Sequence, residues 1–167
     1  MMAYLIGVPL LALLSVIQST VLSHLQLFEG RPDLVLLAVV GWSLTGRTEE
    51  AMVLGMIGGL FLDLLSGLPF GSSAIALILV AFLVSLSEGR FWEAHLLMPL
   101  SATLVASLTF HILGMGAVLL TGRALDPSLA LTRVILPSTF LNLVLALPTT
   151  QLAGGLRDRL FPPEVEI

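Results

Sequence analysis

The chain has 167 residues, of which 57% are hydrophobic and only 11% are charged, and its formal net charge is −4 at pH 7. Because a soluble domain typically carries about 25% charged residues, this composition excludes a water-soluble globular protein and predicts an integral membrane protein. Cys is absent, which excludes disulfides, thiolate nucleophiles and Cys-ligated metals. The seven basic residues are scattered arginines, so we expect no nucleic-acid partner.

The predicted fold is an all-α bundle of about six transmembrane helices, because a hydrocarbon core about 30 Å thick needs roughly 20 apolar residues per helix. Six apolar stretches follow one another at 4–22, 33–44, 51–65, 72–86, 96–120 and 134–156. They predict one transmembrane domain, 1–156, and a short charged tail, 157–167. The first stretch lacks a basic start and a clean cleavage site, so we expect a retained helix rather than a signal peptide. Asp126-Pro127 predicts a loop over 122–132.

The second, third and fourth stretches are shorter than an ordinary transmembrane helix. A re-entrant pair or a soluble core is the alternative reading of these stretches. We favour full spanning, because flanking residues can extend each helix into the interface and there are no soluble elements to cover them. Local thinning of the bilayer is then expected.

An even number of spans places both termini on one side of the membrane. Arginines bias loops toward the cytoplasm, and their distribution predicts that both termini are cytoplasmic. The inner loops would hold Arg47, Arg90, Arg157 and Arg159, and the outer loops Arg31, Arg123 and Arg133.

The third stretch carries a stripe of Gly55, Gly59 and Asp63 at intervals of four residues. Small residues at this spacing let another helix approach closely, either within the bundle or from a partner. Asp63 is costly at membrane depth, so it either faces an intramembrane partner or lies near the headgroups and binds loop amides. Both choices stay open. Gly67, Pro69 and Gly71 predict a tight structural turn after this helix.

The fifth stretch carries a second stripe, Thr103, Ser107 and His111, which predicts hydrogen bonds to neighbouring helices or a proton relay. Gln18 and Asn142 are single amides that could bridge helices or line a small cavity. His24 and His95 fall in predicted loops without a second ligand at a recognisable spacing, so we expect no metal and no cofactor. No nucleophile motif, Walker motif or pair of intramembrane aspartates occurs, so we expect no enzyme activity.

Two segments of the chain carry recognisable motifs. The first consists of Arg31, Pro32 and Asp33 followed by Leu34, with Gln18 upstream. The second is Gly55-x-x-x-Gly59-Leu60-x-x-Asp63-x-x-Ser66-Gly67-x-x-x-Gly71. With these motifs the chain resembles the MreD family of bacterial rod-shape-determining proteins, and its length, six-helix pattern and charged tail are similar as well.

The resemblance implies a non-catalytic component of the machinery that elongates the side wall, in the bacterial cytoplasmic membrane. It further implies docking of the bitopic protein MreC, alongside MreB, a RodA-type glycosyltransferase and a penicillin-binding transpeptidase. MreD-like proteins also resemble in fold the S subunits of energy-coupling-factor vitamin transporters, which supplies the alternative function. The scaffold is favoured, because the first stretch lacks the Ala-x-x-x-Ala docking pattern of S subunits and the loops lack an evident polar and aromatic cluster for a vitamin.

Overall fold

In the computed structural model, the regular elements of the described residues are all helices, as the apolar stretches predicted. The structure describes residues 2–22, 29–86 and 97–161. The elements are α1 (Met2–Thr20), α2 (Leu34–Ser43), α3 (Thr48–Leu65), α4 (Ser72–Ser85), α5 (Leu97–Leu120), α6 (Pro127–Leu129), η1 (Ala130–Ile135) and α7 (Leu136–Leu160). The predicted all-α fold class is therefore confirmed.

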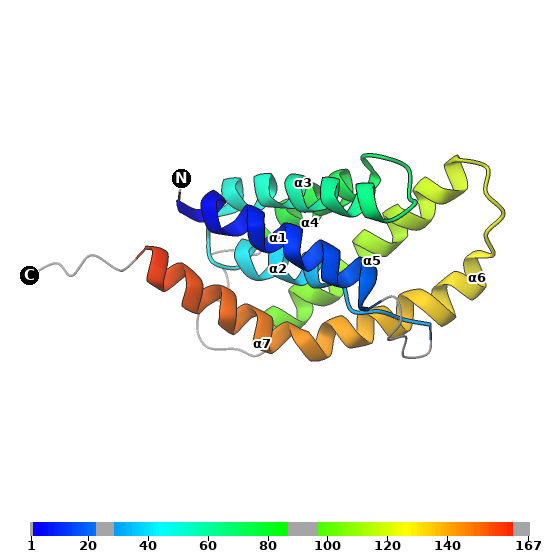
Figure 1. The fold of residues 1–167 in the computed structure, drawn as a ribbon. Coiled ribbons are helices and arrows are strands. Elements are labelled where there is room, and N and C mark those ends of the chain that lie inside the picture. The colour runs from blue at the N-terminus through cyan, green and yellow to red at the C-terminus, as the bar shows by residue number, and fades with distance from the viewer. Residues whose placement is uncertain (1, 23–28, 87–96, 162–167) are drawn as a thin grey trace, which may run out of the picture.

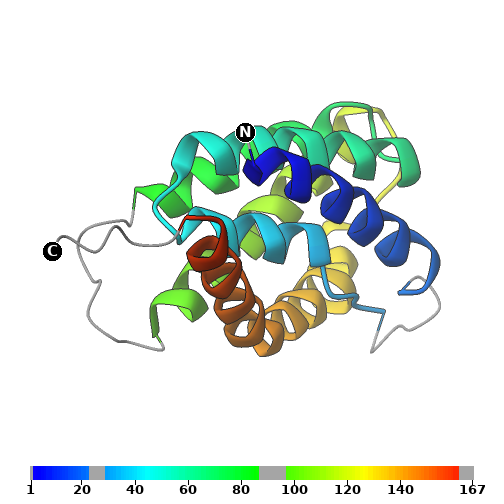
Figure 2. The ribbon, with the colours of Figure 1, turned by 60° about the vertical axis from the view of Figure 1, so that its left-hand side comes forward.

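The short helix α2 lies in the middle of the bundle (Figures 1 and 2). It packs against α1, α3, α4, α5 and α7. Nearly every residue of α2 is buried, including Val35, Leu36, Val39 and Val40. A helix that is apolar on all sides is stable only when other elements surround it, which is the position that α2 occupies.

The length of α2 has a physical consequence. Its ten residues extend about 15 Å at 1.5 Å per residue, which is half of the roughly 30 Å hydrocarbon core. Irregular backbone at membrane depth is tolerated only where protein groups satisfy its amides and carbonyls. The segment that leads into α2 therefore needs polar partners inside the bundle.

Within the described residues, three helices are long and apolar enough to cross a membrane, namely Ala3–Thr20, Leu97–Leu120 and Pro127–Leu160. The helices α2 and α4 are apolar but shorter. The long helices partly enclose α2 and α4. These two short helices therefore do not face lipid along their whole length.

The sixth helix begins at Pro127, inside the segment 122–132 that we expected to be a loop. Asp126 accepts hydrogen bonds from the backbone amides of Ser128 and Leu129 and caps the helix. The hydrogen bonds from Ser128 hold the pKa of Asp126 below its ordinary value. Asp-Pro is common in turns, but it is also a helix start, with Asp as the N-cap and Pro in the first turn.

This helix continues through the π-helical segment η1 into α7. Pro137, at the start of α7, cannot donate an amide hydrogen bond, and its ring crowds the carbonyl four residues earlier. The wider π turn ahead of Pro137 relieves that crowding, which is a physical reason for its position.

The two ends of the bundle differ in what they hold (Figure 1). The start of α1 and the end of α7 lie at one end. The opposite end, here named the turn end, holds the connection 66–71 between α3 and α4 and the connection 121–126 between α5 and α6. At the end that holds the start of α1, Arg47 forms an ion pair of 2.6 Å with Glu50 and stacks over the ring of Phe161.

Candidate functional site

Asp33 is the centre of a buried polar network that joins α1, α5 and α7 to the start of α2. Its carboxylate accepts hydrogen bonds from Gln18 Nε2 at 3.2 Å and from Asn142 Nδ2 at 3.0 Å. Asn142 Nδ2 also donates to Ser107 Oγ at 3.1 Å. His111 Nε2 lies 3.3 Å from the Asp33 carboxylate. The name Asp33 network is used below for Gln18, Asp33, Ser107, His111 and Asn142.

The Asp33 network also accepts hydrogen bonds from backbone amides at the start of α2. The amide of Asp33 donates to Asn142 Oδ1 at 2.7 Å, and the amide of Val35 donates to Gln18 Oε1 at 3.2 Å. The amide of Arg31 donates to Ser138 Oγ at 3.0 Å. These side chains supply the polar partners that a short helix starting inside the bundle requires. Pro32 contributes by disfavouring a helical conformation at Arg31.

The ring of His111 bridges two oxygen atoms. Its Nδ1 lies 2.7 Å from the carbonyl oxygen of Ser107, and its Nε2 faces Oδ2 of Asp33. A carbonyl oxygen only accepts hydrogen bonds, so Nδ1 carries a hydrogen. The contact between Nε2 and the carboxylate is then favourable only with one further proton between them, on the ring or on the carboxyl group.

The stripe Thr103, Ser107 and His111 divides between two environments. Ser107 and His111 belong to the Asp33 network, whereas the Oγ1 of Thr103 is buried without a hydrogen-bond partner among the described residues. Gln18 and Asn142 both bridge helices. The sequence showed these residues as separate signals, and only the fold brings them to one carboxylate.

Asp63 forms the centre of a second, separate cluster at the start of α4. Its carboxylate accepts hydrogen bonds from the amides of Gly71 at 2.9 Å, Ser73 at 3.0 Å and Ala74 at 3.3 Å. Asp63 is 6% exposed. One of these amides belongs to the turn and two belong to the first turn of α4, and the depth of Asp63 in the membrane stays a prediction. The negative charge also interacts favourably with the N-terminal end of the α4 dipole.

The turn 66–71 takes the form that its glycines permit. Gly67 and Gly71 have φ values of +29° and +92°, which are rarely adopted by residues with a side chain. The carbonyl of Pro69 accepts hydrogen bonds from the amide and hydroxyl of Ser72. Arg123 donates to the carbonyl of Gly67 at 2.9 Å, which ties this turn to the connection between α5 and α6.

The glycine stripe of α3 lies inside the bundle, against α4. A Cβ atom at Gly59 would overlap the backbone of Ser73 and Ala74. At Gly55 it would lie 3.0 Å from the carbonyl oxygen of Leu77. Gly30, which the sequence did not single out, packs in the same way against Pro137 and Ser138 of α7. These glycines allow close backbone contact between helices.

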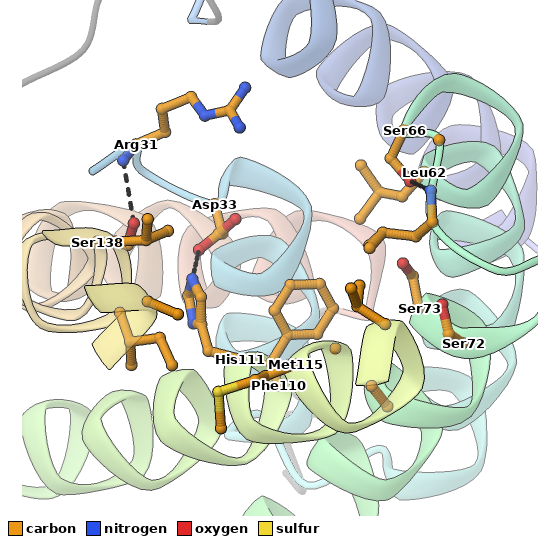
Figure 3. A pocket seen from close by; sticks show the side chains of 18 of the residues that line it. Arg31, Asp33, Leu62, Ser66, Ser72, Ser73, Phe110, His111, Met115 and Ser138 are labelled. Atoms are coloured by element: carbon orange, nitrogen blue, oxygen red, sulfur yellow. Dashed lines mark hydrogen bonds and ion pairs between the residues drawn. The ribbon is translucent and has the colours of Figure 1, made fainter. Parts of the chain in front are cut away.

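A cavity of about 570 Å³ opens beside the Asp33 network at the turn end (Figure 3). Its polar lining includes Arg31, Asp33, Ser73 and His111. Its apolar lining includes Phe110 and Met115. The sequence did not predict this cavity, because its walls come from α1, the segment before α2, α3, α4, α5, η1 and α7. No local sequence motif therefore marks the cavity.

Residues 2–22, 29–86 and 97–161 contain no group of three or more His, Asp or Glu residues that could hold a metal ion. His24 and His95 lie outside the described residues. The expected absence of metal and cofactor therefore stays a prediction.

The family model of rod shape-determining protein MreD matches residues 1–152. The chain belongs to the MreD family. The resemblance inferred from Gln18, Arg31 to Asp33 and the glycine motif is thus confirmed. No curated protein and no solved structure is similar enough to this chain to match it. The expected likeness to transporter S subunits therefore stays a prediction.

Membership of the MreD family gives the chain a role in rod-shape determination as a membrane protein. It also implies association with the MreB and MreC shape-determining machinery. The MreD residues quoted for the resemblance fall into two structural groups. Gln18 and Asp33 belong to the Asp33 network, whereas Gly59, Asp63 and the turn 66–71 fix α3 against α4.

Proposed function

We propose that this MreD protein is a non-catalytic scaffold that docks an MreC-like bitopic protein within the cytoplasmic membrane. The docked protein is thereby held beside a RodA-type glycosyltransferase and a penicillin-binding transpeptidase, with MreB in the larger complex. The family match and its implied association with the shape-determining machinery support this proposal. Both termini are cytoplasmic in this arrangement, which agrees with the start of α1 and the end of α7 lying at one end of the bundle.

The observation that carries the proposal is the division between polar and apolar side chains. Gln18 and Asn142 both donate hydrogen bonds to the carboxylate of Asp33 inside the bundle. The outer faces of the helices instead present large apolar side chains, for example Leu5 and Ile75, which are 75% and 67% exposed. A partner recognised at this level of the membrane therefore binds through apolar packing, as a transmembrane helix does.

We place the docking surface along α1 and α7. Both helices pack on α2, and a small apolar recess of about 40 Å³ lies there. Ala38 and Trp42 of α2 line it together with Leu10 of α1 and Leu156 of α7. With the small Ala38 among its lining residues, the recess lets a side chain of a partner helix pack closely into the bundle.

Site-specific photocrosslinking tests this placement. A photoreactive amino acid at Leu10, which is 39% exposed, is compared with one at Ile75 on α4, which does not line the recess. We expect a crosslink to the MreC-like protein in native membranes from position 10 and none from position 75. Crosslinks from position 75 alone would move the docking surface to α4, and crosslinks from neither position would refute docking at these helices.

The alternative function, a vitamin-binding S subunit, draws on the cavity of about 570 Å³, which is within the size range of small-molecule sites. The discriminating result is a small molecule that copurifies with the protein together with an ATPase module. The scaffold instead predicts a copurifying bitopic protein.

A further inference from the structure

The cavity at the turn end combines a polar wall with an apolar wall. Arg31, Asp33 and His111 contribute to the polar wall, and Phe110, Met115 and Val118 contribute to the apolar wall (Figure 3). Its volume of about 570 Å³ is that of a ligand site rather than a packing defect. A ligand that fills it satisfies both walls only if it is amphiphilic.

Arg31 sets the charge of this cavity. Its guanidinium has no hydrogen bond or ion pair within the described part of the chain, where only its backbone amide is bonded. The carboxylate of Asp33 is occupied by the side-chain amides of Gln18 and Asn142 and by the ring of His111. The carboxylate of Asp63 is occupied by the amides at the start of α4 and does not line the cavity. An anionic group is therefore the favoured occupant beside Arg31.

Ser73 supplies an independent sign of a missing ligand. Its side chain is 2% exposed, and its Oγ has no hydrogen-bond partner among the described residues. A buried hydroxyl without a partner is unfavourable unless a ligand or a water molecule supplies the missing hydrogen bond. Ser73 lies on the α4 side of the cavity, and Arg31 lies across the cavity at the segment before α2 (Figure 3).

The residues at the edge of the cavity have the same mixed character. Leu65 is 47% exposed, and Arg31 is exposed as well, and both line the cavity. An apolar side chain beside a cation, on a bundle that lies in a membrane, is suited to a ligand that is part headgroup and part hydrocarbon.

We propose that this cavity binds the anionic headgroup of a membrane phospholipid. Arg31 provides the counter-charge for the phosphate, and the Oγ of Ser73 donates a hydrogen bond to it. Phe110, Met115 and Val118 contact the start of the acyl chains. This inference is independent of the docking of a bitopic partner, because the cavity and the recess on α1 and α7 have no residue in common.

Native mass spectrometry of the full chain tests the proposal. Protein stripped of lipid in neutral detergent is titrated separately with phosphatidylglycerol, phosphatidylcholine and inorganic phosphate. We expect saturable binding of one phosphatidylglycerol. Arg31→Gln weakens it about tenfold, because a charge-assisted bond is lost, and Ser73→Ala weakens it by about threefold or more. Arg157→Gln, on the exposed part of α7, serves as the charge-matched control and leaves binding unchanged.

Thermal unfolding of the lipid-free proteins separates binding from folding. Because the Ser73 hydroxyl has no partner without a ligand, Ser73→Ala should keep or raise the unfolding temperature and still lose affinity. Equal lipid retention in all variants would overturn the proposal. Equal affinity for phosphatidylcholine would overturn the role of the anionic charge. Arg31-dependent binding of inorganic phosphate, with no binding of lipid, would assign the cavity to a free anion and overturn the lipid assignment.

Discussion

Asp33 and Asn142 are joined in both directions, although 109 residues separate them in the sequence. The backbone amide of Asp33 donates to Asn142 Oδ1 at 2.7 Å, and Asn142 Nδ2 donates to the Asp33 carboxylate at 3.0 Å. The pair fixes the start of α2 to the N-terminal part of α7. The central helix is thereby held at one depth in the bundle.

Asn142→Leu should destabilise the protein strongly. The change leaves the amide of Asp33 without its acceptor and removes a donor to its carboxylate, at a cost of about 1 to 3 kcal/mol per unsatisfied buried group. Gln151→Leu is the matched control, since Gln151 is an exposed amide on the same helix. Thermal unfolding in detergent is the measurement. An unfolding temperature for Asn142→Leu within the error of the Gln151→Leu value would refute the structural role of the pair.

His111 should carry a hydrogen on Nδ1 at neutral pH. The carbonyl of Ser107 lies 2.7 Å from this nitrogen and can only accept. Nitrogen NMR of ¹⁵N-histidine-labelled protein reports the state of each ring nitrogen. The double variant His24→Gln and His95→Gln leaves His111 as the single histidine of the chain's three. A neutral ring protonated on Nε2 alone would contradict the geometry.

Gly59→Ala should disrupt the contact between α3 and α4. The added methyl group would overlap the backbone of Ser73 and Ala74, and backbone cannot move aside as a flexible side chain can. We expect a loss of about 1 to 3 kcal/mol, the usual cost of overpacking. Gly116→Ala is the control, because nothing lies within 4 Å of a Cβ at that position on α5. In that variant the higher helix propensity of Ala should keep or raise stability. Equal effects of the two substitutions would be inconsistent with this packing.

Asp63→Asn should loosen the turn 66–71 and the start of α4. The substitution removes the negative charge that strengthens the hydrogen bonds from the amides of Gly71, Ser73 and Ala74. The NH2 group of the new asparagine also faces one of these amides, so that two donors meet. We expect a loss of about 1.5 to 3 kcal/mol, as for hydrogen bonds to charged groups. Asp158→Asn, which alters an exposed ion pair, should change stability by less than about 1 kcal/mol. Hydrogen exchange at Ser73 and Ala74 would rise in the first variant alone.

The fold class and the family could be predicted from the sequence because their signals are local. Apolar stretches follow the chain one after another, and the motif from Gly55 to Gly71 is contained in one helix and one turn. The start of the sixth helix was missed because Asp126-Pro127 is compatible with both a turn and a capped helix. Tertiary packing, rather than the dipeptide, decides between these two structures.

The candidate site could be predicted only in pieces. Gln18, His111 and Asn142 were each recognised as polar residues in apolar stretches, and Asp33 only as part of the motif that resembles MreD, but no periodicity relates residues on different helices. The cavity and the orphaned hydroxyl of Ser73 gave no sequence signal at all. They arise from how several segments, distant in the sequence, leave space between them. Gly30 was missed because its close contact with Pro137 is likewise a property of the fold.

Gentle affinity purification of the tagged protein from its native membrane tests the proposed scaffold function most directly, with proteins and small molecules both identified by mass spectrometry. The account predicts recovery of an MreC-like bitopic protein in stoichiometric amount. The Gly116→Ala variant serves as a folded control and should recover the partner to the same extent. Recovery of an ATPase module with a bound vitamin, and no bitopic partner, would contradict the scaffold function and establish the transporter subunit instead.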